Sequence, residues 1–191
     1  MKVISSLNFA KFISFVILGL IIAGFFYFET STILRSLVIL LGLVGLWQLS
    51  RNPEILGVLL LYLGLYDFYN IRYGLAVPTA VILIGVFGLS IFLVYLLTKI
   101  YNLGEILEKN IILVYLLTAG LIVLEIFLAM SLWPVDPKTK ALVIVIVFYL
   151  SMRLVYLNAH RVLSLKRAGG FVLVSILVLA SVIGLSWWFG F

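Results

Sequence analysis

The sequence lacks cysteine altogether and is poor in charged residues, which make up 10% of its 191 positions. Without cysteine the chain has no disulfides, no thiolate nucleophile and no thiolate metal ligand. It contains one histidine and seven acidic residues, whereas a metal centre needs three or four ligands in one place. We therefore expect no metal, no cofactor and no thiol chemistry.

The composition also leaves no room for a water-soluble domain. Hydrophobic residues make up 65% of the chain, and they form runs that follow one another from Phe12 to Phe191 with short polar interruptions. A helix of roughly 20 residues spans the hydrocarbon core of a bilayer. The sequence therefore predicts an all-α transmembrane helix bundle that forms a single domain over residues 1–191.

Polar breaks rich in turn-forming residues divide the apolar runs into seven predicted helices. These predicted helices cover residues 12–28, 32–49, 54–70, 75–98, 110–132, 141–158 and 171–190. The third is short and carries Asp67. Its presence matters, because removing it would invert the orientation of every later helix.

The basic residues set the orientation, since Lys and Arg are enriched on the cytoplasmic side of membrane proteins. With seven helices and the N-terminus inside, the basic residues outside are Arg72, Lys138 and Lys140. Those inside are Lys2, Lys11, Arg51, Lys99, Lys109, Arg161, Lys166 and Arg167. We therefore expect a multi-pass protein of the cytoplasmic (inner) membrane, with an uncleaved signal anchor and the C-terminus outside. The net charge of +6 reflects this asymmetry rather than binding to nucleic acid.

Three ionisable residues fall inside predicted helices in the outer half of the membrane: Arg35, Asp67 and Glu125. A charged group inside a bilayer costs about 2.5–3.5 kcal/mol, so each of them needs an explanation. Because neighbouring helices run in opposite directions, we predict one polar cluster, which serves as an outward-facing pocket or a proton relay. Alternatively, Arg35 and Asp67 pair at the outer interface, which leaves Glu125 unexplained.

A second candidate site is a stripe of tyrosines on the third predicted helix. Tyr62, Tyr66, Tyr69 and Tyr73 recur at spacings of four, three and four, which places the four phenols on one face of a helix. Tyr69 and Tyr73 fit the aromatic belt of a membrane interface, whereas Tyr62 and Tyr66 lie deeper. The stripe is either a contact between helices or the wall of a ligand site.

The sequence carries no catalytic motif. His160 has no serine or acid spaced as in a catalytic triad. Phosphate-binding loops and the His-Glu-x-x-His motif are also absent. We therefore expect that the chain is not an enzyme.

One stretch runs from Glu125 to Pro134 and is followed by Phe148, Tyr149 and Arg153 in the sixth predicted helix. This part of the sequence resembles an uncharacterised family of small polytopic membrane proteins from reduced-genome bacteria. The resemblance covers the C-terminal part of the chain. It implies a membrane localisation and no particular activity.

We expect the chain to be a non-enzymatic scaffold or accessory subunit of a membrane assembly. Its expected partners are membrane lipids and either a membrane subunit or a second copy of itself, with no nucleic acid. The alternative is a small transporter or channel that uses the cluster of Arg35, Asp67 and Glu125. A transporter needs the two carboxylates in a cavity that water can reach, whereas a scaffold tolerates them sealed into ion pairs.

Overall fold

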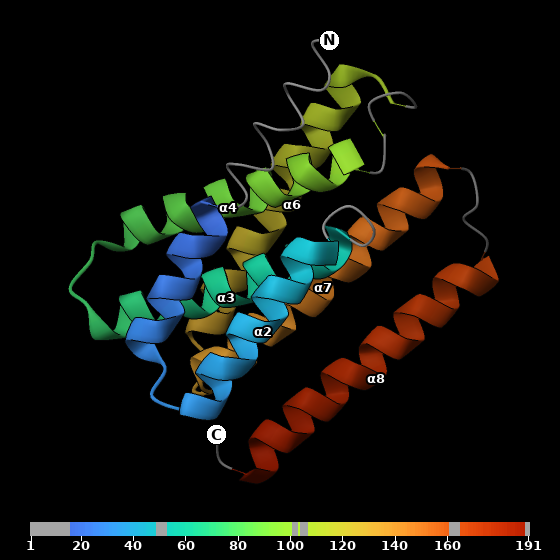
Figure 1. Ribbon diagram of the computed structural model, residues 1–191. Coiled ribbons are helices and arrows are strands. Elements are labelled where there is room, and N and C mark those ends of the chain that lie inside the picture. Colours follow the sequence, from blue (N-terminus) through green and yellow to red (C-terminus); the bar gives the residue numbers. More distant parts are fainter. Residues whose placement is uncertain (1–15, 49–52, 101–102, 104–106, 161–164, 190–191) are drawn as a thin grey trace.

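The computed structural model describes residues 16–48, 53–100, 103, 107–160 and 165–189, and within these ranges it is a helix bundle without strands. The first described helix is Val16–Phe28. The others are α2 (Thr32–Gln48), α3 (Pro53–Gly74), α4 (Thr79–Ile100), α6 (Lys109–Ser131), α7 (Pro137–Ala159) and α8 (Leu165–Phe189) (Figure 1). The prediction of an all-α bundle is confirmed, with seven helices in the described part of the chain.

Three described helices are long and apolar enough to cross a membrane. They are Thr79–Lys99 within α4, Lys109–Ser131 and Pro137–Ala159. Shorter apolar helical stretches are Val16–Phe28, Thr32–Gly42 and Val172–Val182. The described residues are therefore compatible with a membrane protein that has at least these three spans.

Proline sets where two helices begin. Asp136 precedes Pro137, and its Oδ1 accepts a hydrogen bond of 3.0 Å from the backbone N–H of Thr139. Because proline at the first helical position has no N–H to leave unpaired, α7 starts there, before the predicted start at residue 141. In contrast, α4 starts only after Pro78, later than the predicted residue 75, since a proline disfavours helical geometry in the residue before it.

Two predicted breaks are helical in the structure. α3 continues to Gly74 because the polar groups near its end bond to a neighbouring helix. Arg72 Nη1 donates to Ser131 Oγ at 2.7 Å, and the Tyr73 hydroxyl donates to the Ser131 carbonyl at 2.9 Å. α8 begins at Leu165 and runs through Gly169 and Gly170, since a glycine costs a helix only about 1 kcal/mol relative to alanine.

α3 lies at the centre of the described bundle. It packs against α2, α4 and α7. Its residues Leu60, Leu61, Leu63 and Leu65 are fully buried, and these positions point in different directions around a helix. α4 also packs on α6, and α8 lies along α7 on the outside of the bundle (Figure 1).

Close packing between α3 and α4 depends on Gly85 rather than on its neighbour Gly88. A Cβ atom added at Gly85 would lie 2.6 Å from Phe68 Cε1, whereas one added at Gly88 would have no heavy atom within 4 Å. Small residues let helices approach where the lipid is as apolar as the side chains. Within the described bundle Gly85 has this role and Gly88 does not.

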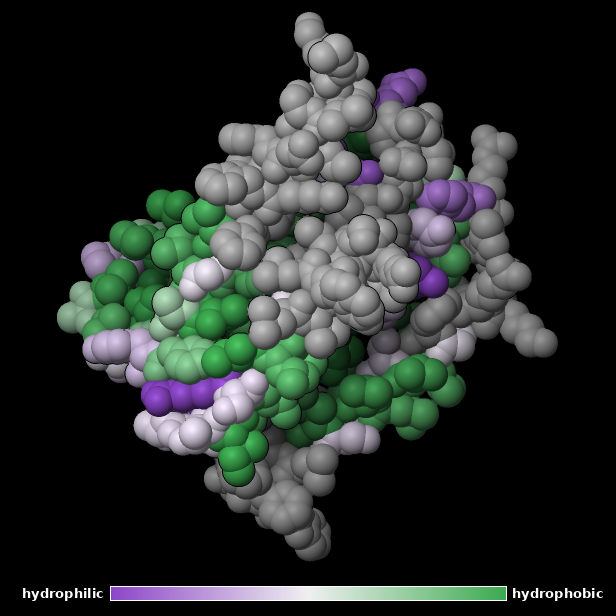
Figure 2. Space-filling view, in the orientation of Figure 1, coloured by the Kyte–Doolittle hydropathy of each residue, from purple (hydrophilic) through white to green (hydrophobic). Residues whose placement is uncertain are grey.

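Hydrophobic side chains cover most of the described surface seen in Figure 2, where hydrophilic residues form separate spots. The exposed apolar residues include Leu20, Ile33, Leu40 and Leu177. Apolar surface of this extent is unusual for a monomer in water. It is the ordinary outer surface of a helix bundle that faces lipid.

Candidate functional site

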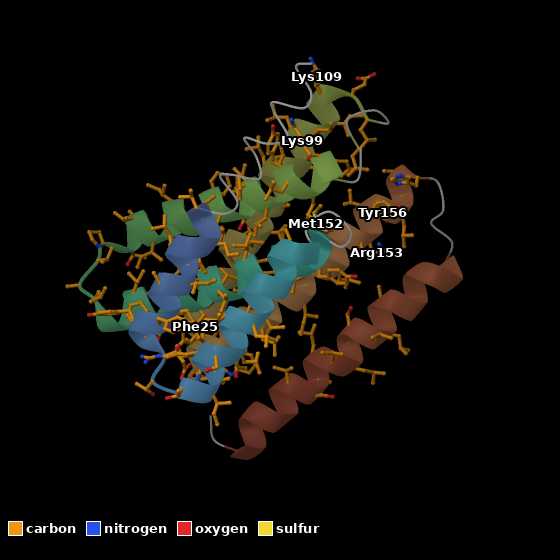
Figure 3. All side chains as sticks on the ribbon, in the orientation of Figure 1. Phe25, Lys99, Lys109, Met152, Arg153 and Tyr156 are labelled. Atoms are coloured by element: carbon orange, nitrogen blue, oxygen red, sulfur yellow. The ribbon has the colours of Figure 1, made fainter. Side chains whose placement is uncertain are left out.

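Polar side chains meet at one end of the bundle, where α2 and α7 begin and α3 and α6 end. We call this the Glu29 end. Figure 3 shows Phe25 near it, and shows Lys99 and Lys109 close to the opposite end. Arg153 lies toward that opposite end on α7, with its guanidinium carbon 5.2 Å from the centre of the Tyr156 ring. The two ends thus carry different polar groups.

Glu29 is the centre of the network at its end. The side chain is only 4% exposed, and its Oε2 lies 2.9 Å from Nζ of Lys138 on α7. The backbone N–H of Ser31 donates to Oε1 at 3.0 Å, and the Tyr66 hydroxyl donates to Oε2 at 3.4 Å. Glu29 therefore joins the connection before α2 to both α3 and α7.

The network lowers the pKa of Glu29 below its ordinary value of 4.5. Burial alone raises this pKa, but the hydrogen bonds from Lys138, Ser31 and Tyr66, together with the positive charge of Lys138, outweigh burial. Hydrogen bonds to an ionised carboxylate favour the ionised form. Glu29 is therefore a charged group at neutral pH, held by its partners.

Lys140 is a buried cation close to this network. Its side chain is 3% exposed, and its Nζ donates to the Tyr73 hydroxyl at 2.8 Å. The same Nζ lies 4.6 Å from the centre of the Tyr73 ring and 5.5 Å from that of Tyr69. A desolvated cation over an aromatic ring gains about 2 kcal/mol. The rings thus stabilise a charge that lies inside the bundle.

The predicted tyrosine stripe lies against neighbouring helices. The Tyr69 hydroxyl donates to the Phe127 carbonyl at 3.0 Å, and the two rings stack with their centres 4.2 Å apart. Tyr66 packs on Phe25 at 5.1 Å between ring centres, and Tyr62 is half-buried against the core. With Tyr73 bonded to α6, these contacts favour a structural role in helix packing over a ligand site.

The structure does not join Arg35, Asp67 and Glu125 by ion pairs. Arg35 Nη2 donates to the carbonyl of Phe26 at 2.8 Å, and the guanidinium lies over the Phe26 ring. Asp67 is 7% exposed, and its Oδ1 has no hydrogen-bond partner within residues 16–48, 53–100, 103, 107–160 and 165–189. The ion pairs between described residues include neither one within the predicted cluster nor the alternative Arg35–Asp67 pair; Arg35 bonds to a backbone carbonyl of the preceding helix.

Glu125 has a different environment from Asp67, because it lies on the exposed face of α6. The same face carries Thr118, Leu121 and Leu128, which are also exposed. Among the described residues, none forms a hydrogen bond or an ion pair with the Glu125 carboxyl. It lies six residues before Ser131, about 9 Å from the end of the helix at 1.5 Å per residue.

The residues that sequence reasoning missed are Glu29, Lys138 and Lys140. The sequence places all three in or beside polar breaks, where groups are expected to be solvated. The predicted topology puts the polar breaks at residues 29–32 and 134–137 on one side of the membrane. Glu29 and Lys138 have opposite charges and lie in or beside these breaks, so the sequence could have indicated that they pair. No pattern in the sequence predicts that Lys140 is buried against the rings of Tyr69 and Tyr73.

The described residues do not bring three or more His, Asp or Glu side chains together as a possible metal site. Nδ1 of His160 lies 3.0 Å from the Tyr156 carbonyl one turn earlier in the same helix. No family model, curated protein or solved structure matches the chain.

Proposed function

We propose that the chain is a seven-span protein of the cytoplasmic membrane that acts as a non-enzymatic scaffold or accessory subunit. Its partner, a membrane subunit or a second copy, covers the exposed face of α6 around Glu125. The N-terminus is inside and the C-terminus outside. The resemblance to small polytopic membrane proteins of reduced-genome bacteria stays a prediction.

The arrangement of helix ends supports the topology. The contacts of Glu29 with Lys138, and of Arg72 with Ser131, bring the ends of several helices to one side. Lys99 and Lys109 lie toward the other side (Figure 3). In the predicted topology eight Lys and Arg residues, Lys99 and Lys109 among them, lie on that other side, and three, Arg72, Lys138 and Lys140, lie at the Glu29 end. An excess of Lys and Arg marks the cytoplasmic side, so the Glu29 end faces outward in this proposal.

The observation that carries the proposed function is the carboxyl of Glu125, which is exposed and has no partner among the described residues, on a helix long and apolar enough to span a membrane. A charged side chain facing lipid costs about 2.5–3.5 kcal/mol, and intramembrane acids almost always face the interior of a bundle. A partner helix that donates a hydrogen bond or carries a cation removes this cost. Thr118 lies two helical turns away on the same face and offers a second polar contact.

The transporter alternative requires Arg35, Asp67 and Glu125 to act in one polar cavity. Of the three, Asp67 lines an apolar cavity between Val16–Phe28, α3 and α4. Arg35 and Glu125 line neither this cavity nor the one between α4, α6 and α7. We therefore favour the scaffold or accessory subunit.

Photo-crosslinking in native membranes tests the partner face. A photoreactive amino acid is placed at Leu121 or Leu128, both exposed on α6, and at Leu40, exposed on α2, as the control. We expect a discrete protein adduct from both α6 positions and none from Leu40. Glu125→Leu should reduce the α6 adduct, whereas Glu125→Gln should keep more of it because the amide still forms hydrogen bonds.

Two outcomes would contradict the proposal. One is the absence of protein adducts at Leu121 and Leu128 when the protein is present at its natural level. The other is an adduct that Glu125→Leu leaves unchanged, which would separate the interface from the acid. An adduct that contains two copies of the chain would identify the partner as the protein itself.

A further inference from the structure

A groove lined by apolar residues holds the buried carboxyl of Asp67. It lies between helix Val16–Phe28, α3 and α4, and has a volume of about 430 Å³, within the range of small-molecule sites of roughly 300–1,000 Å³. Its walls include Leu20, Phe68 and Leu89. Asp67 is the one ionisable residue among those that line it.

Glycines make the space around this carboxyl. A Cβ atom at Gly24 would lie 2.5 Å from Asp67 Oδ2, so only glycine lets the carboxyl lie against the first helix. Gly88 also lines the groove, and a Cβ atom there would meet no heavy atom within 4 Å. The groove that Asp67 lines is therefore open at Gly88.

The carboxyl has no partner in the part of the chain that the structure describes. Asp67 is 7% exposed, Oδ1 is buried without a hydrogen bond, and the described residues give it no ion pair. A buried carboxyl is stable only when it is neutral or when a cation pairs with it. The surrounding apolar walls favour a cation that carries hydrocarbon.

We propose that this groove binds a cationic amphiphile, with a protonated tertiary amine on Asp67 and an alkyl chain along the apolar walls. A tertiary ammonium has a single N–H, which one carboxylate satisfies. A primary ammonium has three N–H donors, and the apolar walls offer few acceptors for the two donors that do not bond to Asp67. The ligand reaches the groove from the membrane, where such amines partition. This inference does not depend on the partner face, because Asp67 and Glu125 lie on different helices.

Native mass spectrometry of the full-length protein released from detergent micelles tests the binding. The probe is N,N-dimethyldodecylamine, and dodecanol is the neutral probe of equal chain length. We expect one amine per chain, bound about tenfold or more tightly than dodecanol, because a hydrogen bond between an ammonium and a carboxylate is stronger than one from a neutral hydroxyl. Equal binding of both probes would overturn the proposal.

Three variants assign the binding to the groove. Asp67→Asn keeps the shape and removes the charge, so amine binding should weaken about tenfold or more. Gly88→Leu fills the groove while keeping the acid, and it should weaken binding even where Asp67→Asn folds poorly. Glu125→Gln removes the other intramembrane carboxylate and should bind like the parent. Binding that persists in both Asp67→Asn and Gly88→Leu, or that is lost in Glu125→Gln, would overturn the proposal.

Discussion

Replacing Glu29 with alanine should destabilise the protein more than its place in a short connection suggests. The substitution removes the ion pair with Lys138 at 2.9 Å, the hydrogen bond from the Ser31 N–H at 3.0 Å and that from the Tyr66 hydroxyl at 3.4 Å. These contacts join the connection before α2 to α3 and α7. We therefore expect the packing of the first helices on α7 to weaken.

The three contacts contribute unequally. Tyr66 is buried and Ser31 is half-buried, and a donor left without a partner costs about 1–3 kcal/mol. Lys138 is 41% exposed, so water replaces most of its lost interaction and its share is at most about 1 kcal/mol. Tyr66 therefore accounts for about 1–3 kcal/mol, and with smaller shares from half-buried Ser31 and exposed Lys138 the loss for Glu29→Ala is about 2–5 kcal/mol. Glu29→Gln keeps an acceptor for Ser31 and should cost about 1 kcal/mol.

Equilibrium unfolding in mixed micelles at neutral pH measures these values. The matched control is Glu108→Ala, since Glu108 is an exposed acid that caps no helix through its side chain. An exposed substitution of this kind should stay within about 0.5 kcal/mol of the parent. The reasoning is refuted if Glu29→Ala costs no more than Glu108→Ala, or if Glu29→Gln costs as much as Glu29→Ala.

Three further predictions concern local features. The pKa of Glu29 is lowered in the folded protein, so its stabilising effect is present above the ordinary value of 4.5 and is lost as the pH falls through the lower folded pKa. The free energy of unfolding should therefore drop on acidification below about pH 4.5 in the parent, and this drop should be smaller in Glu29→Gln; equal slopes would contradict it. Asp136→Ala removes the cap of α7 and should cost about 1 kcal/mol, while Asp136→Ser should recover most of that in thermal unfolding. Gly85→Ala forces a methyl group against Phe68 and should cost about 1–3 kcal/mol, whereas Gly88→Ala should be neutral or stabilising, and equal effects would show that the α3–α4 contact is not close.

The helices could be predicted because long apolar runs and polar breaks are local properties of the sequence. The tyrosine spacing likewise places four phenols on one face. Helix ends were less accurate where a neighbouring helix decides them. The end of α3 is such a case, since Arg72 and Tyr73 bond to Ser131 instead of water.

The directions in which the intramembrane acids face could not be predicted. In a helix that is apolar all round, the hydrophobic pattern does not say which side meets the protein and which meets lipid. Asp67 therefore proved to be buried and Glu125 exposed, although both belong to the same predicted cluster. Arg35 bonds to the Phe26 carbonyl, a backbone contact that no residue pattern encodes.

The seven-span topology is the central claim, because it places Glu125 in the hydrocarbon and the Glu29 end outside. The chain has no native cysteine, so single cysteines can be placed at the exposed positions Thr30, Ala76, Glu108 and Asn158. Treatment of intact cells with a membrane-impermeant thiol reagent should label the cysteines at Thr30 and Ala76, and should label those at Glu108 and Asn158 only after permeabilisation. Labelling at Glu108 without permeabilisation, or different labelling of the cysteines at Thr30 and Ala76, would contradict the topology.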